Sequence, residues 1–183
     1  ALRTLGYNLQ FNVSHSGGWA LYAIALDRRV GIDLEEIRPM PNAAQLAQRF
    51  FTEREYAQLL AQPTDQQELA FFRGWTRKEA YLKATGEGLG GLETVEVSLL
   101  EDQPRYLETV QDNPSHTSNG RPLLATHQSE IRQSKTHQPE TLLKPQWLIQ
   151  DIPLDSNHRA AVVMESTTYD AEPLSIRFWD LCV

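Results

Sequence analysis

Cysteine and long apolar runs are scarce in this sequence. Cys182 is its single cysteine, so no disulfide can form within the chain, as is typical of proteins from a reducing compartment. We therefore expect a cytoplasmic protein. The longest apolar run, Trp19 to Leu26, is far shorter than the roughly 20 residues that cross a bilayer. We expect no transmembrane helix and no membrane partner.

Basic residues are also in deficit. The chain has 17 Lys and Arg against 24 Asp and Glu, a net charge of −7. Nucleic-acid binding depends on Lys and Arg that neutralise phosphates, so the balance argues against nucleic acid as the main partner. Apolar residues at 40% and charged residues at 22% are ordinary for a globular protein with one core or two small lobes.

Strands are predicted near the start of the chain. Apolar and polar residues alternate from Tyr7 to Val13, the period of a half-buried strand, and Ser14 to Gly18 is expected to form a turn. Trp19 to Leu26 and Val30 to Glu35 are predicted as further strands. The turn signal at Asp27 to Arg29 predicts that these two strands form a hairpin.

Three helices follow, predicted at 42–51, 52–62 and 65–85. Thr52 and Glu55 have the spacing of a capping box. Asn42 and Asp65 are expected to cap the other two helices, and Gly86 to end the last one.

Further strands are predicted at 94–100, 146–152, 158–164 and 174–179. Between them, residues 111–144 are rich in Ser, Thr, Gln, His, Asn and Pro. Such a segment cannot bury enough apolar surface to offset its ordering entropy, so we expect a mobile excursion there. The mixture of elements predicts an α+β fold with antiparallel strands.

Two acidic residues on a predicted strand are candidates for a metal site. Asp33 and Glu35 are two residues apart and so share one face of the strand. They could simply form a solvated edge. Alternatively, carboxylate oxygens with phosphate and water are the ligands that Mg²⁺ takes.

The long predicted helix places charge in an apolar stripe. Glu79 and Lys83 fall on the same face as Trp75. An ordinary surface pair at i,i+4 is one interpretation; the other is a functional site, because charge beside aromatic rings is costly unless a ligand meets it. Ser14 and His15 add a hydroxyl and an imidazole that can bind phosphate. Together these groups indicate metal-assisted phosphoryl chemistry.

Three blocks, in this order, resemble the 4′-phosphopantetheinyl transferases of the Sfp type. They are Phe-Asn-Val-Ser-His-Ser at 11–16, Gly-Ile-Asp-Leu-Glu at 31–35 and Trp-Thr-Arg-Lys-Glu-Ala at 75–80, continued to Lys83. The likeness is close over residues 7–100 and looser beyond.

The resemblance implies transfer of the phosphopantetheine arm of coenzyme A to a serine of an apo acyl or peptidyl carrier protein, with release of adenosine 3′,5′-bisphosphate. It implies Mg²⁺ as cofactor, with the ligands Asp33, Glu35 and Glu79. Ser14, His15 and Lys83 would contact coenzyme A phosphates.

Catalysis in this scheme falls to Glu79, which would accept the serine proton, and to Lys83, which would offset developing charge. Lys78 belongs to the motif but points away from Glu79 in the helical phase. Four arginines on the predicted helices could guide an acidic carrier protein: Arg49, Arg54, Arg73 and Arg77.

The family fold implied here is a pseudo-dimer of two similar α+β lobes in one chain, for which a monomer suffices. In this chain we expect the first lobe to be truncated at its N-terminal side, with residues 1–30 as its remnant and 31–183 as the C-terminal lobe. The truncation motivates one alternative, a non-catalytic fragment that binds coenzyme A or a carrier protein. A Mg²⁺-dependent phosphohydrolase that uses the same acids is another.

Overall fold

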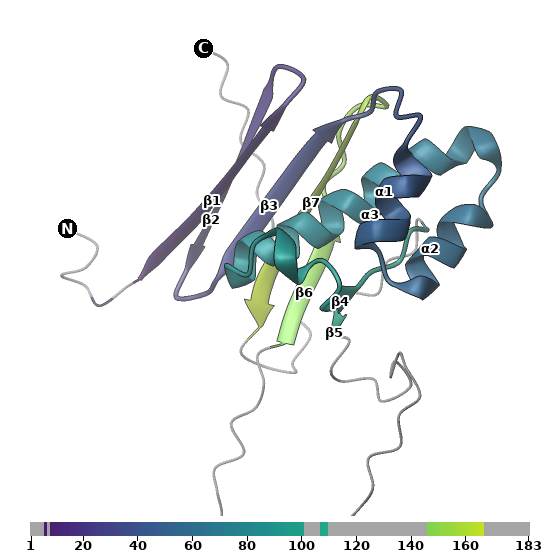
Figure 1. Ribbon diagram of the computed structural model, residues 1–183. Helices are drawn as coiled ribbons and strands as arrows, with labels where there is room; N and C mark the ends of the chain where they lie inside the picture. Colours follow the sequence, from purple (N-terminus) through teal and green to yellow (C-terminus); the bar gives the residue numbers. More distant parts are fainter. Residues whose placement is uncertain (1–5, 7, 101–106, 110–145, 167–183) are drawn as a thin grey trace, which may run out of the picture.

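A computed structural model describes residues 6, 8–100, 107–109 and 146–166 (Figure 1). The elements of this part, in chain order, are β1 (Leu9–Ser16), β2 (Trp19–Leu26), β3 (Val30–Glu36), α1 (Ala43–Phe50), α2 (Glu53–Leu60), α3 (Thr64–Thr85), a 3₁₀ turn (Leu89–Gly91), β4 (Val95–Glu96), β5 (Glu108–Thr109), β6 (Gln146–Asp151) and β7 (His158–Ser166). All strand pairs among these residues are antiparallel, so the predicted α+β class is confirmed.

The central sheet has the strand order β3-β7-β6. Strand β7 is the middle strand, and its apolar run Ala160–Val163 is buried. On β3, Asp33 lies opposite Ala161. The predicted hairpin between 19–26 and 30–35 is wrong, because β3 pairs with β7, more than 120 residues later in the chain. Local turn signals carry no information about such a distant partner.

Strand β2 instead pairs with β1 in a two-stranded ribbon (Figure 1). The turn between them is Gly17-Gly18, with φ of 54° and 81°, a conformation that glycine adopts without steric cost. Ser14 and His15 therefore lie inside β1 rather than in the predicted turn.

The helices follow their predicted positions closely. Thr52 and Glu55 form both hydrogen bonds of a capping box at the start of α2. Gly86 ends α3 with a φ of 80°, as predicted. Asp65 does not cap α3: the helix begins at Thr64 after Pro63, whose backbone carbonyl accepts a hydrogen bond from Gln66 N.

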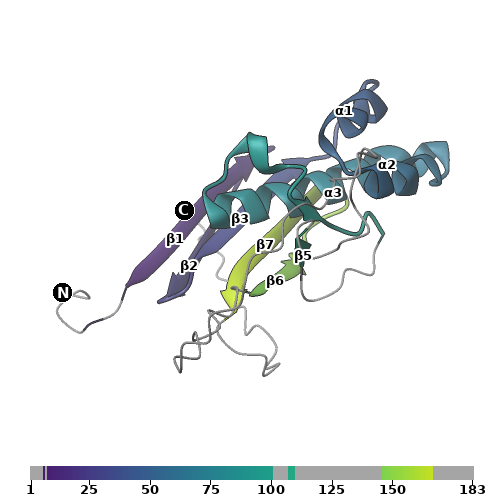
Figure 2. The same cartoon turned by 60° about the horizontal axis from the view of Figure 1, so that its bottom comes forward.

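Helix α3 lies across one face of the central sheet, with α1 and α2 packed at one end of it (Figures 1 and 2). Residues Ala80, Tyr81 and Ala84 of α3 pack with Trp147 and Val163 of the sheet. A second cluster joins the three helices. The opposite face of β3, with Ile32 and Leu34, packs with β7 and with Ala23 of the ribbon.

One other predicted strand is shorter in the structure, and two predicted segments are not tested by it. The strand expected at 94–100 is reduced to Val95–Glu96. The expected excursion at 111–144 and the expected strand at 174–179 lie outside the described residues. Among those residues no helix combines the length and apolarity needed to cross a membrane. The two-lobed arrangement remains a prediction.

Candidate active site

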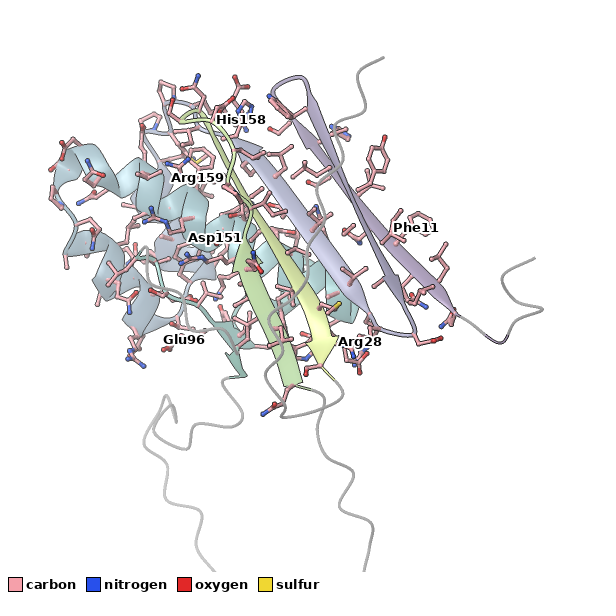
Figure 3. The ribbon with its side chains drawn as sticks, turned by 180° about the vertical axis from the view of Figure 1, so that it is seen from behind. Phe11, Arg28, Glu96, Asp151, His158 and Arg159 are labelled. Carbon is pink, nitrogen blue, oxygen red and sulfur yellow. The ribbon has the colours of Figure 1, made fainter. Side chains whose placement is uncertain are left out.

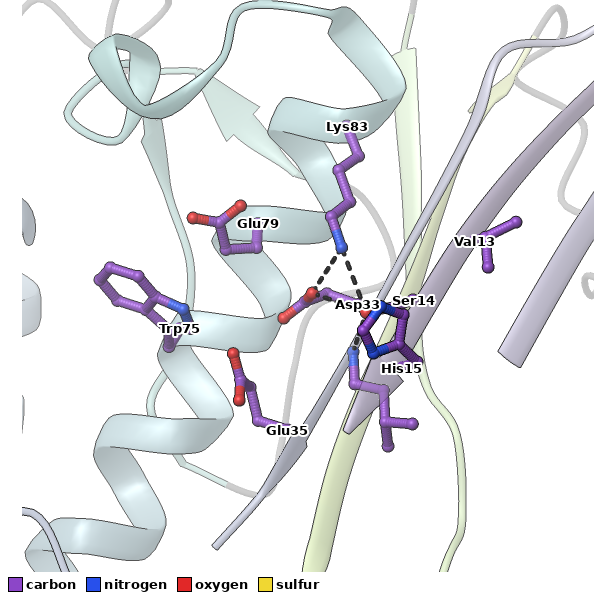
Figure 4. Close-up of a pocket in the computed structure, with 9 residues that line it drawn as sticks. Val13, Ser14, His15, Asp33, Glu35, Trp75, Glu79 and Lys83 are labelled. Atoms are coloured by element: carbon purple, nitrogen blue, oxygen red, sulfur yellow. Dashed lines mark hydrogen bonds and ion pairs between the residues drawn. The ribbon is translucent and has the colours of Figure 1, made fainter. Parts of the chain in front are cut away.

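One cavity of about 410 Å³ is lined by all six residues that the sequence singled out. They come from three elements: Ser14 and His15 from β1, Asp33 and Glu35 from β3, Glu79 and Lys83 from α3 (Figure 4). The remaining lining residues are Val13, Leu34 and Trp75.

Gly31 allows α3 to pack closely against β3. A Cβ atom at this position would lie 2.1 Å from the carbonyl oxygen of Ala80 and 2.5 Å from the amide nitrogen of Ala84, far inside van der Waals contact. Gly31 and Asp33 are two residues apart on β3 and therefore lie on the same face of the strand, toward α3. The same close approach therefore brings Asp33 within reach of Lys83.

Asp33 is the most deeply buried of the six, with 4% of its surface exposed. Its Oδ1 atom accepts hydrogen bonds from Lys83 Nζ at 2.7 Å and from Ser14 Oγ at 3.1 Å. Burial raises the pKa of Asp33, and the charge and hydrogen bond of Lys83 oppose that rise. Its Oδ2 atom is buried without a hydrogen-bond partner within the described part of the chain.

Glu35 and Glu79 are half-buried, and their carboxyl groups reach into the same space beside Asp33 (Figure 4). Burial raises the pKa of each group, and the negative charge of Asp33 raises it further. Within the described residues neither carboxylate accepts a hydrogen bond or forms an ion pair. The cavity thus gathers negative charge that Lys83 offsets only in part.

The donor set is chemically suited to Mg²⁺, since it combines carboxylate oxygens with the unpartnered Oδ2 of Asp33. In this structure, however, no group of three or more His, Cys, Asp or Glu side chains from the described ranges is arranged to hold a metal ion. Binding by Asp33, Glu35 and Glu79 together therefore requires their side chains to move closer.

Lys78 lies outside the cavity, in agreement with the helical phase. Its buried ammonium group donates to both oxygens of Glu55, at 2.8 and 2.7 Å, and to the carbonyl oxygen of Val95 at 2.6 Å. Glu55 also accepts from the amide of Val97. The sequence predicts a role for Glu55 only in the capping box, because no local pattern indicates that a lysine 23 residues later is buried against it.

Arg77 is not available to guide a carrier protein. Its guanidinium is fully buried, forms an ion pair with Asp151 and donates to the backbone carbonyls of Ser98 and Leu100. It therefore ties α3 to β6 and to the segment after β4. Arg54, in contrast, lies at the surface in an ion pair with Glu96.

Comparison with known proteins gives matches to one family. The model of the 4′-phosphopantetheinyl transferase superfamily matches residues 29–127, more than half of the chain. The 4′-phosphopantetheinyl transferase HetI of Nostoc sp. is 50% identical over 101 residues, which cover 55% of this chain and 43% of that protein.

Two Bacillus proteins are also similar. The 4′-phosphopantetheinyl transferase psf-1 of Bacillus pumilus is 47% identical over 52% of this chain and 40% of its own length. The 4′-phosphopantetheinyl transferase Sfp of Bacillus subtilis is 34% identical over 58% of this chain and 51% of its own length. The chain thus spans about half the length of the curated relatives it matches. On the family match over residues 29–127, the chain belongs to the 4′-phosphopantetheinyl transferase superfamily.

Proposed function

We propose that the protein transfers the phosphopantetheine arm of coenzyme A to a serine of an apo acyl or peptidyl carrier protein, with Mg²⁺ as cofactor. The observation that carries this proposal is that three carboxylates, Lys83 and the Ser14-His15 pair meet in one cavity. The names of the similar proteins support the reaction class.

In the proposed reaction the serine oxygen forms a bond to the phosphorus that carries pantetheine. The bond from that phosphorus to the bridging oxygen of the pyrophosphate breaks, and adenosine 3′,5′-bisphosphate leaves. Asp33, Glu35 and Glu79 would hold Mg²⁺, which when bound supplies positive charge to the pyrophosphate oxygens.

The side chains of this protein then have distinct tasks. Glu79, directly or through a water molecule, accepts the proton of the serine hydroxyl. Lys83, whose ammonium group Asp33 holds at 2.7 Å, offsets negative charge on the departing phosphate. His15 is exposed beside the cavity and is free to contact a phosphate.

Mass spectrometry of an apo carrier protein incubated with coenzyme A and Mg²⁺ tests the reaction. A mass gain equal to one phosphopantetheine group is expected when the protein is expressed from its complete coding sequence. No gain under these conditions contradicts the proposal. Release of phosphate from coenzyme A without a carrier protein would instead identify a phosphohydrolase.

We also propose the two-lobed arrangement, with residues 1–30 from the first lobe and 31–183 forming the second. It is supported by the half-length match to the relatives and by a row of exposed apolar side chains on the β1–β2 ribbon. The same facts favour the second candidate function, a fragment that binds coenzyme A or a carrier protein without chemistry. Calorimetric binding of coenzyme A, without product formation by the complete protein, would distinguish it.

A further inference from the structure

Strands β1 and β3 belong to different sheets but are joined by side chains. Asn12 Oδ1 accepts a hydrogen bond from Ile32 N at 3.1 Å, Ser14 Oγ from Leu34 N at 3.1 Å, and Ser16 Oγ from Glu36 N at 3.0 Å. The sequence separation is 20 residues in every case. Every second residue of β1 thus accepts a hydrogen bond from every second backbone amide of β3. These three hydrogen bonds are called the seam below.

Ser14 links this seam to the cavity. Its hydroxyl donates to Asp33 Oδ1 at 3.1 Å and accepts from Leu34 N at 3.1 Å and from Lys83 Nζ at 3.2 Å. A serine hydroxyl has one donor hydrogen and two acceptor lone pairs, so these three bonds use its full capacity. Ser14 is also buried, with 7% of its surface exposed.

We infer that Asn12, Ser14 and Ser16 form a positioning seam, which sets the register of β1 against β3. Through it, Ser14 holds Asp33 and Lys83 in place instead of binding a coenzyme A phosphate directly, and the phosphate contact from β1 falls to His15. Asn12 and Ser16 do not line the cavity and act on it only through this register. The effect on coenzyme A rests on the proposed function, whereas the seam itself does not.

The test is a double variant, Asn12→Ala with Ser16→Ala, which leaves Ser14 and every cavity residue unchanged. The backbone amide of Leu34, which donates to Ser14, should exchange its hydrogen about tenfold faster. The reason is that the hydrogen bonds made by Asn12 and Ser16, on either side of it in the seam, are lost. Amides within the β6–β7 pairing should keep their rates. The matched control is Gln10→Ala. Gln10 lies on the same face of β1 as Asn12, but within the described residues its side chain forms no hydrogen bond to β3.

Coenzyme A binding, measured by calorimetry with the complete protein in the presence of EDTA, gives the second readout. The double variant should bind about tenfold more weakly at a temperature where circular dichroism shows it folded, and Gln10→Ala should bind like the unaltered protein. The single variant Asn12→Asp keeps Ser16 and an acceptor oxygen at position 12, so it should retain most of the affinity of the unaltered protein. If the double variant does not fold, Ser16→Ala alone serves, since the Glu36 amide lies at the exposed end of the seam.

Each result decides the inference. Unchanged Leu34 exchange, or unchanged affinity despite faster exchange, overturns it, as does an equal loss in Gln10→Ala. If the unaltered protein fails to bind coenzyme A both in EDTA and with Mg²⁺ added in its place, the proposed function is wrong, and the Leu34 exchange alone decides whether the seam sets the register.

Discussion

Asp33 is the residue at which the charges of the cavity converge. One of its oxygens is used by Lys83 and Ser14, and the other has no partner in the described part of the structure. Its charge contributes to the raised pKa values of both Glu35 and Glu79. A positive ion among these groups would relieve the repulsion, so their close placement is easier to explain by function than by stability.

Asp33→Ala and Glu79→Gln should each lower turnover strongly while the fold is retained. Loss of a general base typically costs about 10² to 10⁴-fold, and loss of a metal ligand weakens the same step. Initial rates of carrier-protein modification, followed by mass spectrometry, measure the effect. Glu36→Gln is the control, because Glu36 is exposed and does not line the cavity. Near-normal rates in Asp33→Ala or Glu79→Gln would refute the roles assigned to them.

Gly31→Ala should destabilise the protein and disturb the cavity together. The added methyl group would overlap backbone atoms of Ala80 and Ala84, which cannot rotate away as a flexible side chain can. Overpacking of this kind costs about 1–3 kcal/mol or more, measured as a change in the free energy of unfolding in urea. Gly90→Ala is the control, since nothing lies within 4 Å of the position that its methyl group would take; equal effects of the two changes would show that α3 does not pack against Gly31 as described.

At the scale of elements, the sequence predicts what local chemistry determines. The bounds of β2 and the capping box of Thr52 and Glu55 follow from short-range patterns. Helical and strand periodicity also place the candidate residues on the correct faces of α3 and β3. The pairing of β3 with β7 and the seam between β1 and β3 depend on distant residues, and no local pattern specifies them.

The buried pair of Lys78 and Glu55 likewise joins residues that are distant in the sequence, so no local pattern predicts it. It joins α3 to α2 and, through the backbone of Val95 and Val97, to β4. Burial lowers the pKa of Lys78 and raises that of Glu55, and their mutual attraction opposes both shifts. Each partner thus depends on the other to remain charged inside the protein.

Lys78→Met should therefore destabilise the fold by roughly 3–5 kcal/mol, because it leaves the Glu55 carboxylate buried without its counter-charge. Chemical denaturation followed by circular dichroism measures the loss. Arg54→Met removes one partner of an ion pair in which the arginine side chain is 60% exposed, and about 0–1 kcal/mol is expected. A similar small loss for both variants would mean that water reaches Lys78.

At the scale of the whole molecule, the outer face of the β1–β2 ribbon stands out among the described residues by its exposed apolar side chains. Three cross-strand pairs place apolar side chains on it: Leu9 with Leu26, Phe11 with Ile24, and Val13 with Tyr22. Phe11, Ile24 and Tyr22 are 70%, 69% and 64% exposed, and Figure 3 shows Phe11 on the side of the molecule away from the helices. Large contiguous apolar patches are rare on monomeric proteins.

This exposed face predicts the dye binding and the solubility of the 183-residue chain. It should bind the dye anilinonaphthalene sulfonate in the native state, because the ribbon offers an apolar surface to solvent. Phe11→Thr combined with Ile24→Thr should reduce that fluorescence and raise solubility, since threonine is polar yet suited to a strand. Leu60→Thr, at an isolated exposed leucine on α2, is the control and should change neither property. Dye binding that the ribbon variant leaves unaltered would show that Phe11 and Ile24 are covered in solution, and the ribbon would then cease to support a two-lobed arrangement.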